Sequence, residues 1–191
     1  MSKKQELETL RIVFLGEPGA GMKTIIDAFA FNTRRLDKKA KDNTDYVYSE
    51  ITIGKKKYEL LIFNLFKNPD LLEMFYTPAA IFYLYDVANR DMFDKFVTRY
   101  LRTIRKYVSK DEYPDTIIAL VGNILDKNAK EVVSQEELDN IVKNYGVHTY
   151  KISKDDISSL DKLFVGTLRL HLGLDEKDDD DGKKCNCCSI Y

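Results

Sequence analysis

In Leu10-Arg11-Ile12-Val13-Phe14-Leu15-Gly16-Glu17-Pro18-Gly19-Ala20-Gly21-Met22-Lys23-Thr24, an apolar run leads into a glycine-rich turn, and a helix pattern follows. A turn of this kind holds a phosphate group with its backbone N–H groups and with the N-terminus of the following helix. The segment approaches the phosphate-loop template G-x-x-x-x-G-K-[ST], but Met22 directly follows the second glycine of the template, Gly21. The sequence therefore predicts a phosphate loop with a departure from the template where the helix begins.

The length and composition of the chain are typical of one globular domain. It has 191 residues, of which 44% are hydrophobic and 32% are charged, and its net charge is −1. A net charge near zero gives no bulk attraction to nucleic acid, so we expect no nucleic-acid partner. Because no apolar run reaches roughly 18 residues and residues 1–6 lack an apolar signal core, we expect neither a transmembrane helix nor secretion. The cysteines are then expected to meet the reducing cytosol.

Strand and helix patterns alternate along the chain. After the opening strand, strands are expected at 46–53, 58–63, 79–85, 116–122 and 148–151, and helices at 24–31, 91–107, 134–144 and 157–172. The first two of these strands flank residues 54–57 as an antiparallel hairpin, and the polar, basic residues 34–45 are expected to form a loop. The alternation predicts an α/β fold with a six-stranded, mostly parallel sheet, one antiparallel hairpin and helices on both faces.

Four segments, in this order and spacing, resemble the small GTPase superfamily, most closely its Rab branch. The segments are similar to the phosphate loop (15–21), the strand and helix start after the second switch (85–93), the guanine-reading N-K-x-D segment (121–126) and the S-A-K loop (152–154). The resemblance implies a P-loop small-GTPase-like domain at 9–174. An N-terminal extension at 1–8 and a tail at 175–191, expected to be disordered, flank it.

By this resemblance the bound cofactor is GTP or GDP. The residues expected at the nucleotide are Gly16, Glu17, Pro18, Gly19, Ala20, Gly21, Met22, Lys23, Thr24, Asn123, Asp126, Ser153 and Lys154. In the N-K-x-D-like segment, Asp126 accepts hydrogen bonds from the guanine edge and Asn123 retains the amide of the pattern. Ile124 replaces the lysine that covers the base, and Lys154 covers its other face. Taken alone, Asn123 and Asp126 are equally the kind of residues that cap a loop.

The phosphate loop can be aligned in two registers. Without a gap, Met22 takes the lysine position and Lys23 takes the Ser/Thr position, and the apolar residues of the helix stay on its buried face. With one inserted residue, Lys23 becomes the phosphate lysine and Thr24 the Mg²⁺ ligand, but Asp27 then faces the apolar side. The first register is preferred, and the second stays open.

The resemblance also indicates that the Mg²⁺ site is altered. Asn64 stands where the family has a metal-binding aspartate, and the candidate threonine ligands are Thr24 or Thr44. Lys67 replaces a glycine that meets the γ-phosphate, and Asn68 replaces the catalytic glutamine that orients the attacking water. We therefore expect weak Mg²⁺ dependence and very slow GTP hydrolysis.

The tail carries all three cysteines, Cys185, Cys187 and Cys188. The ending resembles the Rab-type C-C-x-x-x and C-a-a-X patterns, which implies prenylation of Cys187 and Cys188, with Cys185 as a further candidate. A metal or disulfide cluster is the alternative for these cysteines. Lipidation would make the protein peripheral on the cytosolic side of endomembranes.

The resemblance thus implies a membrane-anchored, Rab-like GTPase that regulates vesicle traffic through effector and regulator proteins. Nucleotide-dependent switching is expected in the loops at 34–47 and 64–76. One alternative is a pseudo-GTPase, a membrane-tethered binding module that works without nucleotide. Another is a different phosphate-loop enzyme such as a nucleotide kinase, although no arginine-rich lid is visible.

Overall fold

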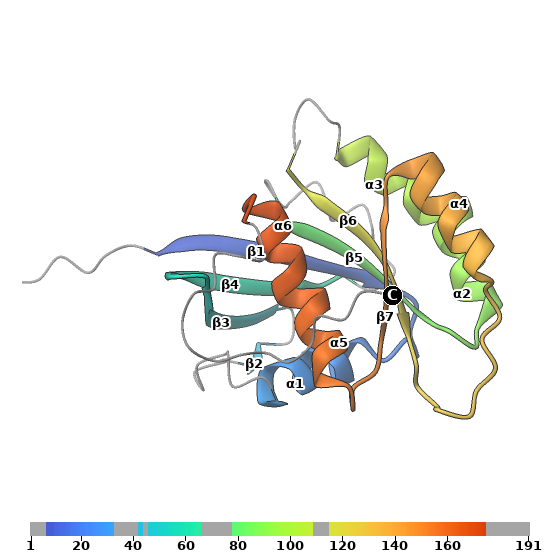
Figure 1. Cartoon of the computed structure of the whole chain (residues 1–191), viewed down its shortest axis with the longest axis horizontal. Helices are drawn as coiled ribbons and strands as arrows, with labels where there is room; N and C mark the ends of the chain where they lie inside the picture. Colours follow the sequence, from blue (N-terminus) through green and yellow to red (C-terminus); the bar gives the residue numbers. More distant parts are fainter. Residues whose placement is uncertain (1–6, 33–41, 44–45, 66–77, 109–114, 175–191) are drawn as a thin grey trace, which may run out of the picture.

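A computed structural model describes residues 7–32, 42–43, 46–65, 78–108 and 115–174 of the chain. Its strands are β1 (Glu8–Gly16), β2 (Asp42–Asn43), β3 (Tyr46–Ile53), β4 (Lys56–Asn64), β5 (Ala80–Asp86), β6 (Ile117–Asn123) and β7 (His148–Ile152). They form one sheet in the order β2-β3-β4-β1-β5-β6-β7 (Figure 1). The pairs β2–β3 and β3–β4 are antiparallel. The pairs β4–β1, β1–β5, β5–β6 and β6–β7 are parallel.

Two of the helices contain a π-helical turn. The helical segments are α1 (Met22–Asn32), α2 (Arg90–Lys95), η2 (Phe96–Tyr100), α3 (Leu101–Tyr107), α4 (Gln135–Tyr145), α5 (Ile157–Asp161), η3 (Lys162–Gly166) and α6 (Thr167–His171). The backbone stays helical across the joins on either side of η2 and η3. The chain therefore forms continuous helices over 90–107 and 157–171, each with one wider turn.

The helices cover both faces of the sheet because successive side chains of a strand point to opposite faces. On one face, Phe82 of β5 packs edge-on to Phe164 of η3, and Phe164 stacks on Phe29 of α1 with ring centroids 3.9 Å apart. On the other face, the next residue, Tyr83, packs on Phe96 and Tyr100 of η2. Aromatic side chains on both sides of β5 thus fix the three-layer arrangement (Figure 1).

The structure confirms the predicted fold class. The six strands expected from the sequence are the six long strands of the sheet, and the expected hairpin is β3 and β4. The short strand β2 lies within the region expected to be a loop, where it pairs with the start of β3. The π-helical turns were not expected, because a hydrophobic pattern does not distinguish a single π turn from an α turn. No described helix is long and apolar enough to cross a membrane.

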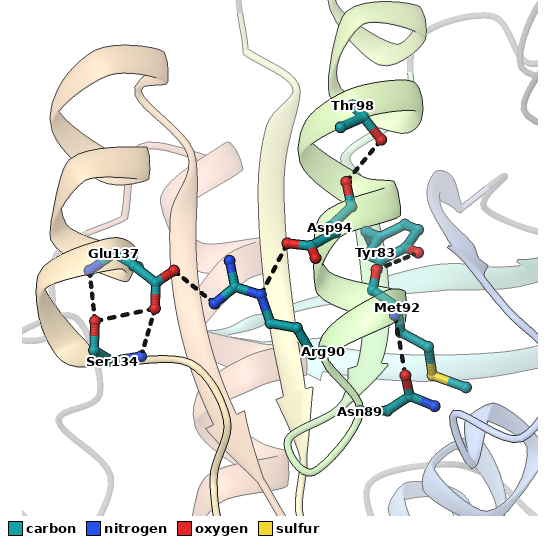
Figure 2. Close-up of polar contacts among 8 residues, drawn as sticks. All are labelled: Tyr83, Asn89, Arg90, Met92, Asp94, Thr98, Ser134 and Glu137. Atoms are coloured by element: carbon teal, nitrogen blue, oxygen red, sulfur yellow. Dashed lines mark hydrogen bonds and ion pairs between the residues drawn. The ribbon is translucent and has the colours of Figure 1, made fainter.

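An arginine joins the two helices on the Tyr83 face (Figure 2). The guanidinium of Arg90, at the start of α2, donates to Asp94 at 2.9 Å and to Glu137 of α4 at 2.7 Å. Glu137 also closes a capping box, in which it accepts the Ser134 N–H at 2.9 Å. The hydrogen bond from Ser134 and then that from Arg90 hold the pKa of Glu137 below its ordinary value of 4.5.

Replacing Glu137 by Gln is expected to change how stability depends on pH. Because the pKa of Glu137 is lower in the folded chain, its carboxylate stabilises the fold fully above pH 4.5, and this contribution is lost as the pH falls through the folded pKa. Glutamine keeps the capping box but not the charge. The Glu137→Gln variant should unfold at lower urea concentration than the wild type at pH 7, by up to about 1 kcal/mol, and the difference should disappear in acid.

The matched control is Glu136→Gln, which removes the neighbouring exposed carboxylate from the same helical turn. Its urea midpoints should follow those of the wild type at every pH. If the difference in urea midpoint between Glu137→Gln and the wild type stayed constant down to pH 3, the lowered pKa of Glu137 would be contradicted.

Candidate functional site

The loops that follow five parallel strands lie along one edge of the sheet. Because β4, β1, β5, β6 and β7 run in parallel, their carboxyl ends meet at the same edge. After β1, the chain forms β3 and β4 on one side of β1 in the sheet, and it then forms β5 on the other side of β1. Such a reversal of strand order marks where open α/β sheets bind ligands, and here the glycine-rich loop occupies it.

The glycine-rich loop is packed tightly against the end of β6. Gly21 has a φ of +82°, and a Cβ atom on it would lie 2.6 Å from Nδ2 of Asn123 and 2.7 Å from Cδ2 of Leu125. The same Nδ2 donates a hydrogen bond to the carbonyl oxygen of Ala20 at 2.9 Å. At the tip of the loop, Pro18 and Gly19 are exposed. The loop therefore requires glycine at position 21 for both its backbone angle and its close contact.

Helix α1 begins immediately after this loop, at Met22. The Met22 side chain is only 4% exposed and belongs to the hydrophobic core, whereas Lys23 and Thr24 are exposed. The buried side of α1 is continued by Ile25 and Phe29. An apolar side chain thus occupies the first helical position, and an ammonium group the second. Lys23 and Thr24, the phosphate and Mg²⁺ residues of the register with an insertion, are thus the second and third residues of α1.

Asn123 has an acceptor atom without a partner. Asn123 is 1% exposed, its Nδ2 donates to the Ala20 carbonyl, and its Oδ1 has no hydrogen-bond partner among the described residues. Buried polar atoms are nearly always satisfied, and the exceptions are accounted for by strain or by a water, an ion or a ligand. The buried amide therefore fits a ligand with a donor group at the carboxyl edge of β6.

Asp126 shapes the loop that follows. One of its carboxylate oxygens accepts the Asn128 N–H at 2.8 Å, and its carbonyl oxygen accepts the Ala129 N–H at 3.1 Å. The side chain is exposed. Asp126 therefore caps its own loop, as the alternative interpretation of the sequence allowed, and still presents a carboxylate to solvent.

The loop after β7 is held next to the loop after β6. The Ile124 N–H donates to the carbonyl of Ile152 at 2.8 Å. Lys127 lies 3.5 Å from a carboxylate oxygen of Asp155, and Lys154 donates to the other oxygen at 2.6 Å. The Lys154 hydrogen bond and the charges of both lysines lower the pKa of Asp155. The structure thus places the loop that carries Asp126 next to the loop that carries Ser153 and Lys154, where β6 ends at Asn123.

The Lys127–Asp155 ion pair was not predicted from the sequence. The sequence offered one signal for it: Lys127 and Asp155 carry opposite charges. Lys127 directly follows Asp126, and Asp155 directly follows Lys154. The pair is surface-exposed and contributes little to stability. Its consequence is positional, because it links the two loops that the sequence indicated for base recognition.

The first two side chains of α1 do not fit a Mg²⁺ ion, whereas the third, Thr24, has an exposed hydroxyl oxygen. Met22 presents a thioether and Lys23 an ammonium without an acceptor, whereas Mg²⁺ requires oxygen ligands. Asn64 ends β4 beside Phe14 with a half-buried neutral amide. In the described part of the chain, no three His, Cys, Asp or Glu side chains are placed to hold a metal ion. The other predicted residues, namely Thr44, Asn68, Cys185, Cys187 and Cys188, lie outside the described residues.

Comparison with known proteins agrees with this arrangement. A family model described as the Ras family matches residues 11–172. The chain belongs to the Ras family. Ras-related protein RABA6b of Arabidopsis thaliana is 23% identical over 176 residues, which cover 87% of this chain and 73% of that protein. Ras-related protein RABC1 of Arabidopsis thaliana is 29% identical, over 71% of this chain and 64% of that protein. Ras-related protein Rab-18-B of Danio rerio is also 29% identical, over 69% of this chain and 64% of that protein.

The relatives identify the branch of this Ras-family chain as Rab-like. Membership of the Ras family implies guanine-nucleotide binding. The glycine-rich loop, Asn123 and Asp126 are all within the matched residues. The departure at Met22 is therefore a feature of this chain within a family whose fold it shares.

Replacing Gly21 by Ala is expected to destabilise the protein strongly. The added methyl group meets the Asn123 amide, and alanine is strained at the φ of Gly21, so the free energy of unfolding should fall by about 3 kcal/mol. The control is Gly54→Ala, since Gly54 has a φ of +59° but no atom within 4 Å of the added Cβ. Its cost should be about 1 kcal/mol. Equal effects of the two variants in urea titrations would contradict the packing of the loop on β6.

Proposed function

We propose that this protein is a Rab-like member of the Ras family that binds guanine nucleotide with little dependence on Mg²⁺ and hydrolyses GTP very slowly. The observation that carries the proposal is the Asn123 side chain, buried between the glycine-rich loop and the end of β6 with one amide atom satisfied and one not. This amide connects the phosphate-binding part of the site to its base-binding part. A guanine nucleotide has a purine edge with hydrogen-bond donors and a chain of phosphates. The base-binding part of the site would take the purine, and the phosphate-binding part would take the phosphates.

The phosphates would be held mainly by the backbone. Pro18 has no N–H, and the Ala20 N–H donates to the Glu17 carbonyl at 3.2 Å. The other N–H groups of the loop and those of the first turn of α1 would supply donors, and the helix dipole supplies partial positive charge. Met22 adds no charge to this set. Lys23 is exposed at the second helical position and offsets phosphate charge from there. Asp126 would accept hydrogen bonds from the guanine edge, and Lys154 would cover the face of the base.

Slow hydrolysis is inferred from the residues around the γ-phosphate position. Hydrolysis requires a group that orients the attacking water and charges that stabilise the transferring phosphoryl group. Met22 is apolar, Asn64 is neutral, and Asn68 is one methylene shorter than glutamine. Each difference removes one contribution to transition-state stabilisation.

A second function is supported by the burial of Met22. Met22 is 4% exposed in the core, so the first helical position is packed by the protein itself and does not need a phosphate there. This favours the pseudo-GTPase alternative, in which the same fold binds partners in a single state. The nucleotide content of the purified protein separates the two functions.

Purified protein that is denatured and analysed by chromatography should release about one guanine nucleotide per chain. Removal of Mg²⁺ with EDTA should lower the Tm by less than about 2 °C, because the metal contributes less than about 1 kcal/mol to binding. Protein that neither carries guanine nucleotide nor gains thermal stability from added GDP would contradict the proposal and favour the pseudo-GTPase.

Two variants serve as controls for the register. In Met22→Lys/Lys23→Ser, the template residues are restored without an insertion, so GDP dissociation should slow and EDTA should lower the Tm more than in the wild type. In Lys23→Ala, GDP affinity should fall by at most about fivefold, because an exposed ammonium offsets phosphate charge only weakly in solvent. Loss of GDP binding in Lys23→Ala, with no gain in the double variant, would establish the inserted register with Lys23 and Thr24 at the phosphates.

We also propose membrane attachment through the tail. Residues 1–8, 9–174 and 175–191 would be an extension, the GTPase-like domain and the lipidated tail, with prenyl groups on Cys187 and Cys188 and Cys185 as a further acceptor. The protein would act on the cytosolic side of endomembranes in vesicle traffic. Its effectors and regulators would bind near the loops at 34–47 and 64–76.

Replacing Cys187 and Cys188 by Ser in the full chain is expected to move the protein from the membrane fraction to the supernatant. Two lipid chains give stable anchoring, whereas the acidic residues at 175–181 oppose attraction to an anionic membrane. Fractionation of cells that express the two forms measures this shift. The control is Ser189→Ala, which changes the same tail without removing an acceptor. Unchanged membrane association of the cysteine variant would refute lipid anchoring at these positions.

A further inference from the structure

The glycine-rich loop contains a carboxylate that is held by the helix over 90–107. Glu17 directly follows Gly16, and its side chain is only 12% exposed. One carboxylate oxygen accepts the hydroxyl of Tyr100 at 2.9 Å, and the other lies 3.4 Å from Nζ of Lys95. Lys95 also pairs with Asp91 at 2.8 Å. The loop is therefore tied to this helix as well as to Asn123 of β6.

Tyr100 is a fixed donor. Its ring is fully buried and packs against Tyr83 with centroids 4.7 Å apart. Burial, followed by the hydrogen bond to Glu17, raises the pKa of Tyr100 to about 12. The hydroxyl therefore stays protonated throughout the physiological pH range and always has a proton to donate.

The π-helical turn η2 places this hydroxyl. The Leu101 N–H bonds to the carbonyl of Phe96, five residues earlier, so the turn contains one additional residue and ends at Tyr100. Tyr100 is the last residue of this wider turn, so the residue that bonds to Glu17 belongs to the π-helical segment itself. Wide turns of this type are rare and are frequent at functional sites.

A carboxylate in a phosphate loop opposes an anionic ligand. Two like charges a few ångströms apart repel each other, and the repulsion is stronger near a protein surface than in bulk water. The contacts of Glu17 direct its carboxylate toward the helix, where the Lys95 ammonium offsets its charge. A free Glu17 side chain would instead be able to rotate toward the tip of the loop at Pro18 and Gly19.

We propose that Tyr100 and Lys95 are positioning residues that hold the loop in its binding-competent shape and keep the Glu17 carboxylate away from the phosphates. The part concerning the phosphates rests on the proposed nucleotide-binding function. The part concerning the shape of the loop does not, because every contact involved lies within the described chain. The two parts therefore call for two separate measurements.

The first measurement is hydrogen exchange of the loop without nucleotide. Tyr100→Phe keeps the ring packing and removes only the hydroxyl, so amides in residues 17–21 should exchange about tenfold faster, while amides of β6 should not change. The matched control is Tyr145→Phe, which removes a hydroxyl from an exposed tyrosine on α4. Unchanged exchange of the loop in Tyr100→Phe would overturn the proposal, whether or not the protein binds nucleotide.

The second measurement is the dissociation of fluorescent GDP from the full chain. Tyr100→Phe should speed dissociation about tenfold, and adding Glu17→Gln to the same chain should recover most of the loss, since no charge is then left to repel the phosphates. Lys95→Gln should also speed dissociation, and added salt should reduce that effect.

The two measurements distinguish failure of the proposed nucleotide binding from failure of the proposed role of Tyr100. Faster loop exchange without any GDP binding in the wild type would contradict the proposed function while supporting the positioning of the loop. GDP binding that is equal in the wild type and in Tyr100→Phe would overturn the role of Tyr100 toward the phosphates. A lower Tm of Tyr100→Phe with unchanged loop exchange would assign the hydroxyl a purely structural role and overturn the proposal.

Discussion

The structure depends on the pairing of β1 along both of its edges. β1 pairs in parallel with β4 on one side and with β5 on the other, and its residues from Ile12 to Gly16 are buried. A parallel strand paired on both sides aligns its carboxyl end with those of its neighbours. The glycine-rich loop that follows β1 therefore lies in the middle of an edge to which β4, β5, β6 and β7 also contribute loops. The site is a consequence of this pairing.

Electrostatics distinguish this site from the template that it resembles. The first helical position carries the buried thioether of Met22 rather than an ammonium, and the loop itself carries the carboxylate of Glu17. Positive potential then comes from backbone N–H groups and from the N-terminus of α1, which act over short distances. The loop is supported from two sides, by Asn123 and by Tyr100 with Lys95. Protein contacts on both sides therefore support its shape.

Much of the fold was predictable because the patterns that encode it are local. Buried parallel strands are continuous apolar runs, as in 79–85 and 116–122, and the expected strands and helices are present. The motif order and spacing predicted a nucleotide site at Gly21 and Asn123, and the structure places these two residues against each other. The contacts of Glu17 and the Lys127–Asp155 pair did not, because they join residues far apart in sequence. The η2 turn was missed because one additional residue in a helix leaves no signature in hydrophobic periodicity.

The sequence by itself determined the fold class, the order of the strands and helices, and the Ras-family loop with methionine at its first helical position, because these depend on residue type and local spacing. Only the tertiary structure decided that Met22 is buried in the core, that one amide atom of Asn123 is left without a partner, and that Glu17 is turned toward Tyr100 and Lys95. The physical reason is that burial, hydrogen-bond satisfaction and charge compensation depend on the side chains that the folded chain brings together.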